Sequence, residues 1–220
     1  ASLTRSVGVL VLVPLVLLYL YGPRGTRAPD RRERAHRRIP SFRLRPDVLF
    51  LLLVPVGSAI YMAVSGDRFG DPFVGWTSAN ELFGRHFTGP YSGLVIGAWD
   101  LVGTFGDAAT GAIGPAKAAQ QLAIFVVAVG FVAAGIAMLW ELPVAYGAYV
   151  LVGLLPALST PVSGGGALAS IPRYVLVAFP VFVWLGGRLS DRRRYLAVLA
   201  VFVVGLAYCT VRLATWHYVS

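Results

Sequence analysis

Six long apolar runs restrict the fold of this sequence more than any other feature. The strongest are LFLLLVPVGSAIYMAV at 49–64 and QLAIFVVAVGFVAAGIAML at 121–139. A helix of about 20 apolar residues crosses the hydrocarbon core of a bilayer. We therefore predict an all-α fold, a polytopic bundle of six transmembrane helices at residues 7–22, 48–64, 120–140, 142–159, 174–188 and 195–213.

The composition supports one transmembrane domain over residues 1–220. Hydrophobic residues make up 57% of the chain, charged residues 13%, and the mean hydropathy is +0.71, which exceeds what a single soluble core requires. The chain starts at Ala1 and enters an apolar run almost at once, so we interpret it as the C-terminal part of a longer polytopic protein. The membrane would be the plasma membrane if the source is prokaryotic, and the endoplasmic reticulum if it is eukaryotic.

The net charge of +9 comes from arginine, because Lys117 is the only lysine. Most arginines lie in two segments, 22–46 and 188–194, and such clusters between apolar runs are typical of cytoplasmic loops. Four predicted crossings separate the two segments, which places both on the same side. No soluble binding module accompanies them, so we expect contact with membrane lipids and no nucleic-acid binding.

This topology places the long loop at 65–119, the loop at 159–173 and both termini on the non-cytoplasmic face. Acidic residues outnumber basic ones in the long loop, which makes it a candidate for chemistry. The single cysteine, Cys209, cannot form a disulfide within the chain, and the three histidines lie far apart in sequence. We therefore predict neither a metal site nor a cofactor.

Residues 71–87 of the long loop have the pattern of an amphipathic helix. Asp71 suits the cap and Pro72 the first position, and Gly89 with Pro90 ends the run. One face collects Phe73, Trp76, Asn80, Phe83 and Phe87. One interpretation is that this helix lies on the outer leaflet or packs on the helix bundle. The other is that the helix and Asp71 line a groove for a sugar. In that groove Trp76 would stack on the sugar ring, and its hydroxyl groups would be bound by Asn80, Glu81 and Arg85.

The next run, YSGLVIGAWDLVGTFG at 91–106, is too short between glycines to span a bilayer. We expect a re-entrant or interfacial segment. Its Asp100 is either a satisfied interfacial carboxylate or a catalytic base.

The stretch SGGGALASIPRYVLVAFPVFVWLGG at 163–187 places an arginine where an apolar helix begins. Ser170 is a candidate cap and Pro172 lies in the first turn, so Arg173 is expected near a helix N-terminus that favours a phosphate. The alternative is that Arg173 extends to the interface and Tyr174 joins an aromatic belt.

Two of these segments resemble the PIG-V type mannosyltransferases, a family of GT-C glycosyltransferases. SIPRYVLVAFPVFVWL is similar to the family pattern S-x-x-R-Y-x-L-x-x-F-P-x-F, and GDPFVGWTSANELFGR to the pattern GDP-x-x-F-x-x-A-Q-x-x-W-G-R. Asn80 stands where the family has glutamine, and Leu82 and Phe83 where a tryptophan is expected. The resemblance covers the C-terminal half of the family's length.

The resemblance implies a multi-pass enzyme that takes mannose from a polyprenyl or dolichyl phosphate donor on the non-cytoplasmic face. The acceptor would be lipid-linked or a protein. Arg173, with Ser170 and Tyr174, would lie near the donor phosphate, and Asp71 and Asn80 near the groove. The catalytic carboxylate is expected upstream of this chain. The alternative hypothesis is a non-catalytic polytopic membrane protein, such as a transporter half or an assembly partner.

Overall fold

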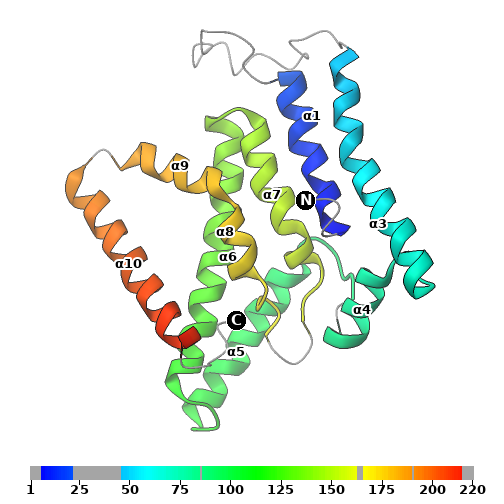
Figure 1. Cartoon of the computed structure of the whole chain (residues 1–220). Coiled ribbons are helices and arrows are strands. Elements are labelled where there is room, and N and C mark those ends of the chain that lie inside the picture. Colours follow the sequence, from blue (N-terminus) through cyan, green and yellow to red (C-terminus); the bar gives the residue numbers. More distant parts are fainter. Residues whose placement is uncertain (1–5, 22–45, 85, 163–165, 190, 215–220) are drawn as a thin grey trace. The chain divides into compact units, whose positions relative to one another are not determined.

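The computed structural model describes residues 6–21, 46–84, 86–162, 166–189 and 191–214. Within these ranges every regular element is a helix, which confirms the all-α prediction (Figure 1). The elements are the 3₁₀ helices η1 (Ser6–Val11) and η2 (Pro46–Leu52) and the α-helices α1 (Leu12–Tyr21), α3 (Leu53–Phe69), α4 (Val74–Phe83), α5 (Ser92–Ala109), α6 (Pro115–Glu141), α7 (Val144–Ser159), α8 (Ile171–Val177), α9 (Phe179–Arg188) and α10 (Arg192–Ala214). The chain divides into two compact units, Ala1–Ala178 and Phe179–Ser220.

Helix α7 is the centre of the first unit. It contacts α1, α5, α6 and α8, and Figure 1 shows it between α1 and α6. The largest fully buried side chains are Met138 on α6, Val150 and Leu154 on α7, and Ile171 on α8. The core of this unit therefore forms where α6, α7 and α8 meet.

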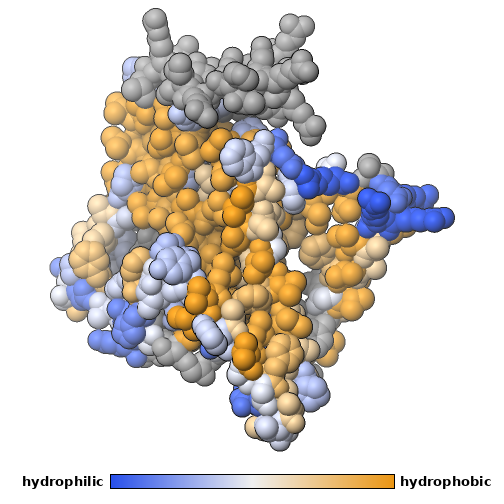
Figure 2. Space-filling model, turned by 180° about the vertical axis from the view of Figure 1, so that it is seen from behind, coloured by the Kyte–Doolittle hydropathy of each residue, from blue (hydrophilic) through white to orange (hydrophobic). Residues whose placement is uncertain are grey.

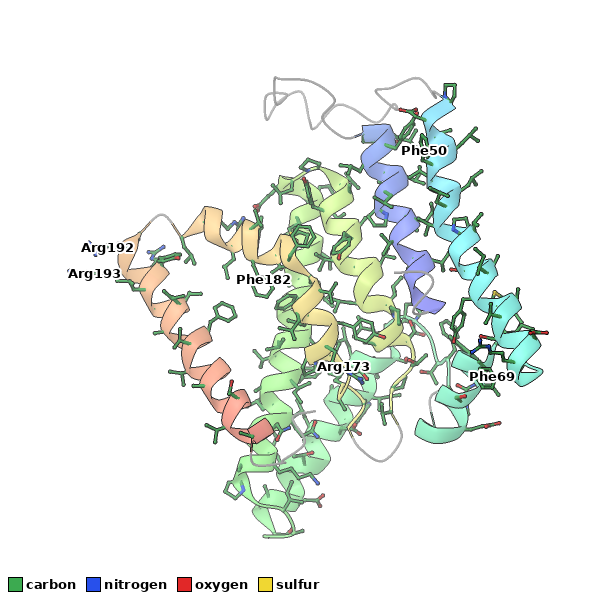
Figure 3. The ribbon with its side chains drawn as sticks, in the orientation of Figure 1. Phe50, Phe69, Arg173, Phe182, Arg192 and Arg193 are labelled. Carbon is green, nitrogen blue, oxygen red and sulfur yellow. The ribbon has the colours of Figure 1, made fainter. Side chains whose placement is uncertain are left out.

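Among the described residues, two helical segments are long and apolar enough to cross a membrane, Pro46–Phe69 and Pro115–Glu141. The core helix of a soluble protein hides its apolar side chains, but the apolar windows of these segments are only 11% and 22% buried. Phe50 and Trp140 are 72% and 85% exposed. Hydrophobic residues cover most of the face in Figure 2, and Figure 3 shows Phe50 on η2 and Phe69 at the end of α3. Exposed apolar surface of this extent is typical of membrane or protein contact.

The start of α5 is tied to the end of α7. The last carbonyl groups of a helix have no partner within it. Here the amide of Thr88 donates to the carbonyl oxygen of Ser159 at 3.0 Å, and the hydroxyl oxygen of Ser92 lies 3.2 Å from the carbonyl oxygen of Leu158. Thr88 before α5 and Ser92 at its start thus satisfy α7 carbonyl groups, an arrangement that the sequence analysis missed.

Helix α5 is longer than predicted. The glycines of the 91–106 run suggested a short segment, but Gly103 and Gly106 lie inside a helix that continues to Ala109. A glycine in a helix costs only about 1 kcal/mol relative to alanine, so the packed helix tolerates both. The predicted end of this run at Gly106 was therefore wrong, because the helix continues to Ala109.

The apolar run at 174–188 is not one continuous helix. Helix α8 ends at Val177, Ala178 has a non-helical ψ of 49°, and α9 begins at Phe179. Pro180 has no N–H group, so it cannot donate a helical hydrogen bond to the carbonyl oxygen of Leu176, and its ring would clash with that carbonyl group in a continuous helix. The predicted fifth span is thus interrupted close to Pro180.

The second unit consists of α9 and α10. The rings of Phe182 and Phe202 meet edge to face with their centroids 5.8 Å apart. The guanidinium of Arg188 lies 4.2 Å from the ring centroid of Trp184, a cation–π contact. Asp191 begins α10 by accepting a hydrogen bond from the amide of Arg193 at 3.1 Å. Of the two arginine-rich segments, 188–194 is described apart from residue 190, whereas 22–45 lies outside the described residues.

Candidate functional site

Helix α8 carries the arginine that the sequence analysis singled out. The helix begins at Ile171 and has Pro172 in its first turn, as predicted. Arg173 is exposed, and none of the described acidic residues forms an ion pair with it. A guanidinium in this state is available to an anion.

Ser170 does not have the predicted capping role. Its backbone is already helical, with φ −83° and ψ −18°, and its side chain makes no capping hydrogen bond. A capping residue normally has an extended backbone that aims its oxygen at the first free amides. Helix α8 also has only seven residues, so we base the site on the guanidinium and its surroundings and not on the helix terminus.

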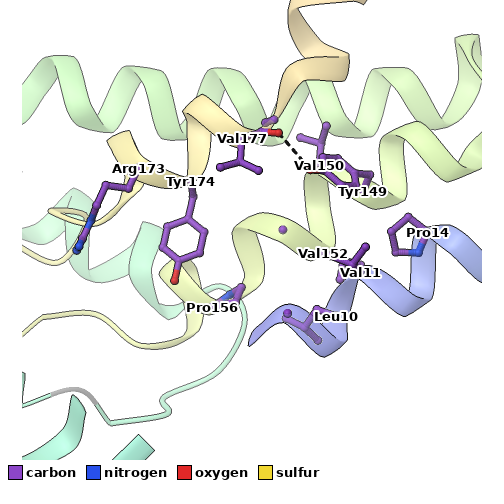
Figure 4. A pocket seen from close by; sticks show the side chains of 13 residues that line it. Leu10, Val11, Pro14, Tyr149, Val150, Val152, Pro156, Arg173, Tyr174 and Val177 are labelled. Carbon is purple, nitrogen blue, oxygen red and sulfur yellow. Dashed lines mark hydrogen bonds between the residues drawn. The ribbon is translucent and has the colours of Figure 1, made fainter. Parts of the chain in front are cut away.

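An apolar groove of about 230 Å³ lies beside Arg173. Its lining residues come from η1, α1, α7, α8 and the residue after α8, and are Gly8, Leu10, Val11, Pro14, Tyr149, Val150, Val152, Gly153, Pro156, Arg173, Tyr174, Val177 and Ala178. In Figure 4, Arg173 and Tyr174 stand at one end, and Val11 and Pro14 stand toward the other. Among the described residues of the lining, Arg173 is the only charged one, and in Figure 4 its guanidinium points away from the other labelled side chains, so the charge lies at the outer edge of one end of the groove.

The groove is also fixed by a hydrogen bond between two of its walls. The hydroxyl of Tyr149 on α7 donates to the carbonyl oxygen of Val177 at the end of α8, at 3.3 Å (Figure 4). This bond satisfies a carbonyl group that α8 leaves free where it ends. Because Tyr149 also lines the groove, the bond holds α8 and its arginine against α7.

The shape and polarity of the groove fit part of an amphiphile. A volume of about 230 Å³ accommodates a segment of an alkyl or isoprenoid chain but is smaller than a typical drug-binding pocket. The guanidinium at one end would meet an anionic headgroup, and its planar array of N–H donors matches phosphate oxygens.

The predicted helix at 71–87 is shorter in the structure. Helix α4 covers Val74–Phe83, and the residue that follows it, Gly84, has a left-handed φ of 57°. Such a residue commonly ends a helix. Phe73 and Phe87 therefore lie outside α4, and the predicted continuous aromatic face is wrong in its extent.

The other loop candidates are not brought into the groove. Trp76 and Glu81 on α4 are exposed and Asn80 is half-buried, and none of the described residues of α4 lines the groove. Helix α4 contacts α3. Arg85 lies outside the described residues.

Asp71 has a local structural role. One oxygen of its carboxylate accepts a hydrogen bond from the amide of Phe73 at 2.8 Å, and the other accepts one from the hydroxyl of Thr77 at 2.7 Å. The carboxylate therefore organises the first turn of α4, as the prediction of a capping residue required.

Replacing Asp71 with alanine is expected to destabilise α4 by about 1 kcal/mol, because both hydrogen bonds are lost. Hydrogen exchange of residues 74–83 would measure this as faster exchange. The matched control is Asp67→Ala, a change of an exposed carboxylate near the end of α3. Unchanged exchange in Asp71→Ala would contradict the capping role.

Asp100 lies on α5, and its carboxylate accepts a hydrogen bond from the backbone amide of Ala167 at 3.0 Å. This bond joins α5 to the segment before α8. In the described part of the chain, no three His, Cys, Asp or Glu side chains cluster as a metal site would require.

The residues that complete the groove with Arg173 were missed by the sequence analysis. Leu10, Val11 and Pro14 come from the first helices, and Gly153 and Pro156 come from α7. Pro14 and Gly153 are 139 positions apart in the sequence (153 − 14), so no local pattern could join them.

Fold and site together define a class of protein: the regular elements of the described residues are all helices, two of these helices are long and apolar enough to span a membrane, and an apolar groove ends at an arginine. No family model, no curated protein and no solved structure matches this chain.

Proposed function

We propose that this chain is part of a multi-pass membrane glycosyltransferase that uses a lipid-phosphate-linked sugar as its donor. The observation that carries the proposal is the groove, because it combines an apolar bed with an arginine available at one end. The lipid chain would lie along Val11, Pro14 and Val150, and the phosphate would meet Arg173. Resemblance to the PIG-V type mannosyltransferases makes mannose the proposed sugar and a lipid-linked molecule or a protein the proposed acceptor.

The proposal includes six membrane crossings. Helical structure covers each of the six predicted apolar runs, in η1–α1, η2–α3, α6, α7, α8–α9 and α10. With both arginine-rich segments on the cytoplasmic side, the loop before α8 faces the opposite side. Arg173 would then meet the donor phosphate at the non-cytoplasmic surface.

The proposed chemistry is a substitution at the anomeric carbon of the sugar. The acceptor hydroxyl oxygen forms a bond to this carbon, the bond from the carbon to the phosphate oxygen breaks, and the hydroxyl proton passes to a carboxylate base. Negative charge develops on the departing lipid phosphate. Arg173 would stabilise this charge, and we assign the base to none of the described residues.

Gly153 provides a direct test of the groove. It lines the groove, and a Cβ added there would meet no atom within 4 Å, so we expect a leucine side chain to occupy part of the groove without displacing the helix. We expect Gly153→Leu to raise the Kd for farnesyl phosphate, a short isoprenoid phosphate, at least about tenfold, because burying the lipid chain supplies much of the affinity. Titration calorimetry in detergent would measure it.

The matched control is Gly130→Leu, because Gly130 also has open space around it and lies on α6 outside the groove. Both variants should melt at or above the wild-type temperature, since a glycine in a helix is replaced by a better helix former. Equal binding by Gly153→Leu and wild type would place the lipid elsewhere. Binding without sugar transfer would instead favour a non-catalytic lipid-phosphate binder.

A further inference from the structure

The carboxylate of Asp100 is directly connected to the segment that leads into α8. Its Oδ2 accepts a hydrogen bond at 3.0 Å from the amide of Ala167. Ala167 is only 2% exposed, whereas Asp100 is exposed on α5. A buried amide without this acceptor would be left unsatisfied, which is costly.

A second contact holds the same segment against α5. Gly97 lies about one turn before Asp100, and a side chain added there would come within 2.8 Å of the Leu168 side chain. Leu168 is 3% exposed. Two successive residues are therefore held against α5, Ala167 by Asp100 and Leu168 by close packing on Gly97.

A continuous series of turns connects this anchor to Arg173. Each of three backbone amides donates a hydrogen bond to the carbonyl oxygen three residues earlier. The distances are 3.1 Å for Ala169 to Gly166, 2.9 Å for Ile171 to Leu168 and 3.2 Å for Arg173 to Ser170. Ser170 and Ile171 are also buried. A shift at Ala167 would thus be transmitted to the backbone of Arg173 and not absorbed by a loose loop.

We propose that Asp100 is a positioning residue, which holds the Gly166–Ser170 segment so that Arg173 stands at the end of the groove. The inference rests on the proposed function for its consequence, the binding of a lipid phosphate. Asp100 acts as a hydrogen-bond acceptor in this role, so its charge is not required. A catalytic base at this position would need the carboxylate itself.

The test compares Asp100→Ala, which removes the acceptor, with Asp100→Asn, which keeps a side-chain oxygen that can accept the Ala167 amide. We expect Asp100→Ala to raise the Kd for farnesyl phosphate about tenfold, and Asp100→Asn to stay within about twofold of wild type. Asp107→Ala is the control, because Asp107 is an exposed carboxylate on the same helix. If Asp100→Asn weakens the binding of farnesyl phosphate as much as Asp100→Ala does, the positioning role is rejected.

Two further measurements separate positioning from a general effect on structure. In the double variant Asp100→Ala with Arg173→Ala, binding should be no weaker than in Arg173→Ala alone, because both changes remove the same interaction. Additive losses would contradict the proposal. Hydrogen exchange at 166–173 should be faster in Asp100→Ala and unchanged in Asp100→Asn. Unchanged hydrogen exchange in Asp100→Ala would overturn the positioning role itself. Failure of the wild-type protein to bind farnesyl phosphate would instead reject the proposed function.

Discussion

Under the proposed glycosyltransferase function, replacing Arg173 with alanine is expected to reduce sugar transfer by about 100-fold, the usual cost of removing one donor to a developing negative charge. Arg173 is exposed and has no ion-pair partner among the described residues, so the variant should fold normally. Transfer of labelled mannose from polyprenyl phosphate mannose, in membranes that contain the protein at matched expression, measures the effect.

The control for this change is Arg68→Ala, which removes another exposed arginine outside the groove, in the last turn of α3. Arg173→Lys should recover part of the activity, because lysine keeps the charge but loses the paired N–H donors. Wild-type transfer in Arg173→Ala would make the arginine an interface anchor. No transfer in the wild type would direct attention to another donor or to the non-catalytic alternative.

Replacing Gly93 with alanine is expected to lower the free energy of unfolding by about 2 kcal/mol, because the added carbon overpacks a helix contact. Its Cβ would lie 2.7 Å from the carbonyl oxygen and 3.0 Å from the Cα of Leu158 on α7. These are backbone atoms, so α5 and α7 must move apart. Unfolding in mixed detergent micelles would measure the loss.

Gly103 is the matched control on the same helix. A side chain there would meet no atom within 4 Å, so Gly103→Ala should leave stability unchanged or raise it by up to about 1 kcal/mol. Equal stability of the two variants would show that α5 does not pack tightly on α7.

The helical fold was largely predictable because apolar runs of sufficient length have few alternatives. The runs at 120–140 and 142–159 correspond closely to α6 and α7. The errors fall at glycine and proline, as in the interruption near Pro180 and in the continuation of α5 beyond Gly103. Such residues lower the stability of a helix and make a break possible, and the packing of the helix decides whether a break occurs.

The candidate site was predictable only in part. Arg173 and Tyr174 were selected from their position at the start of an apolar helix, and both line the groove. The capping role of Ser170 was wrong, because its backbone is helical. The role of Asp100 in fixing Ala167 had no local signal, since 67 residues separate the two.

The sequence by itself determined the all-helical class and the choice of Arg173 as a candidate site residue, because both depend on short-range patterns of apolar and charged residues. Only the tertiary structure decided that the first helices and α7 form an apolar groove beside Arg173, and that α5 anchors the segment before it. These features depend on contacts between residues far apart in the chain. Such contacts follow from how helices pack, which no local pattern encodes.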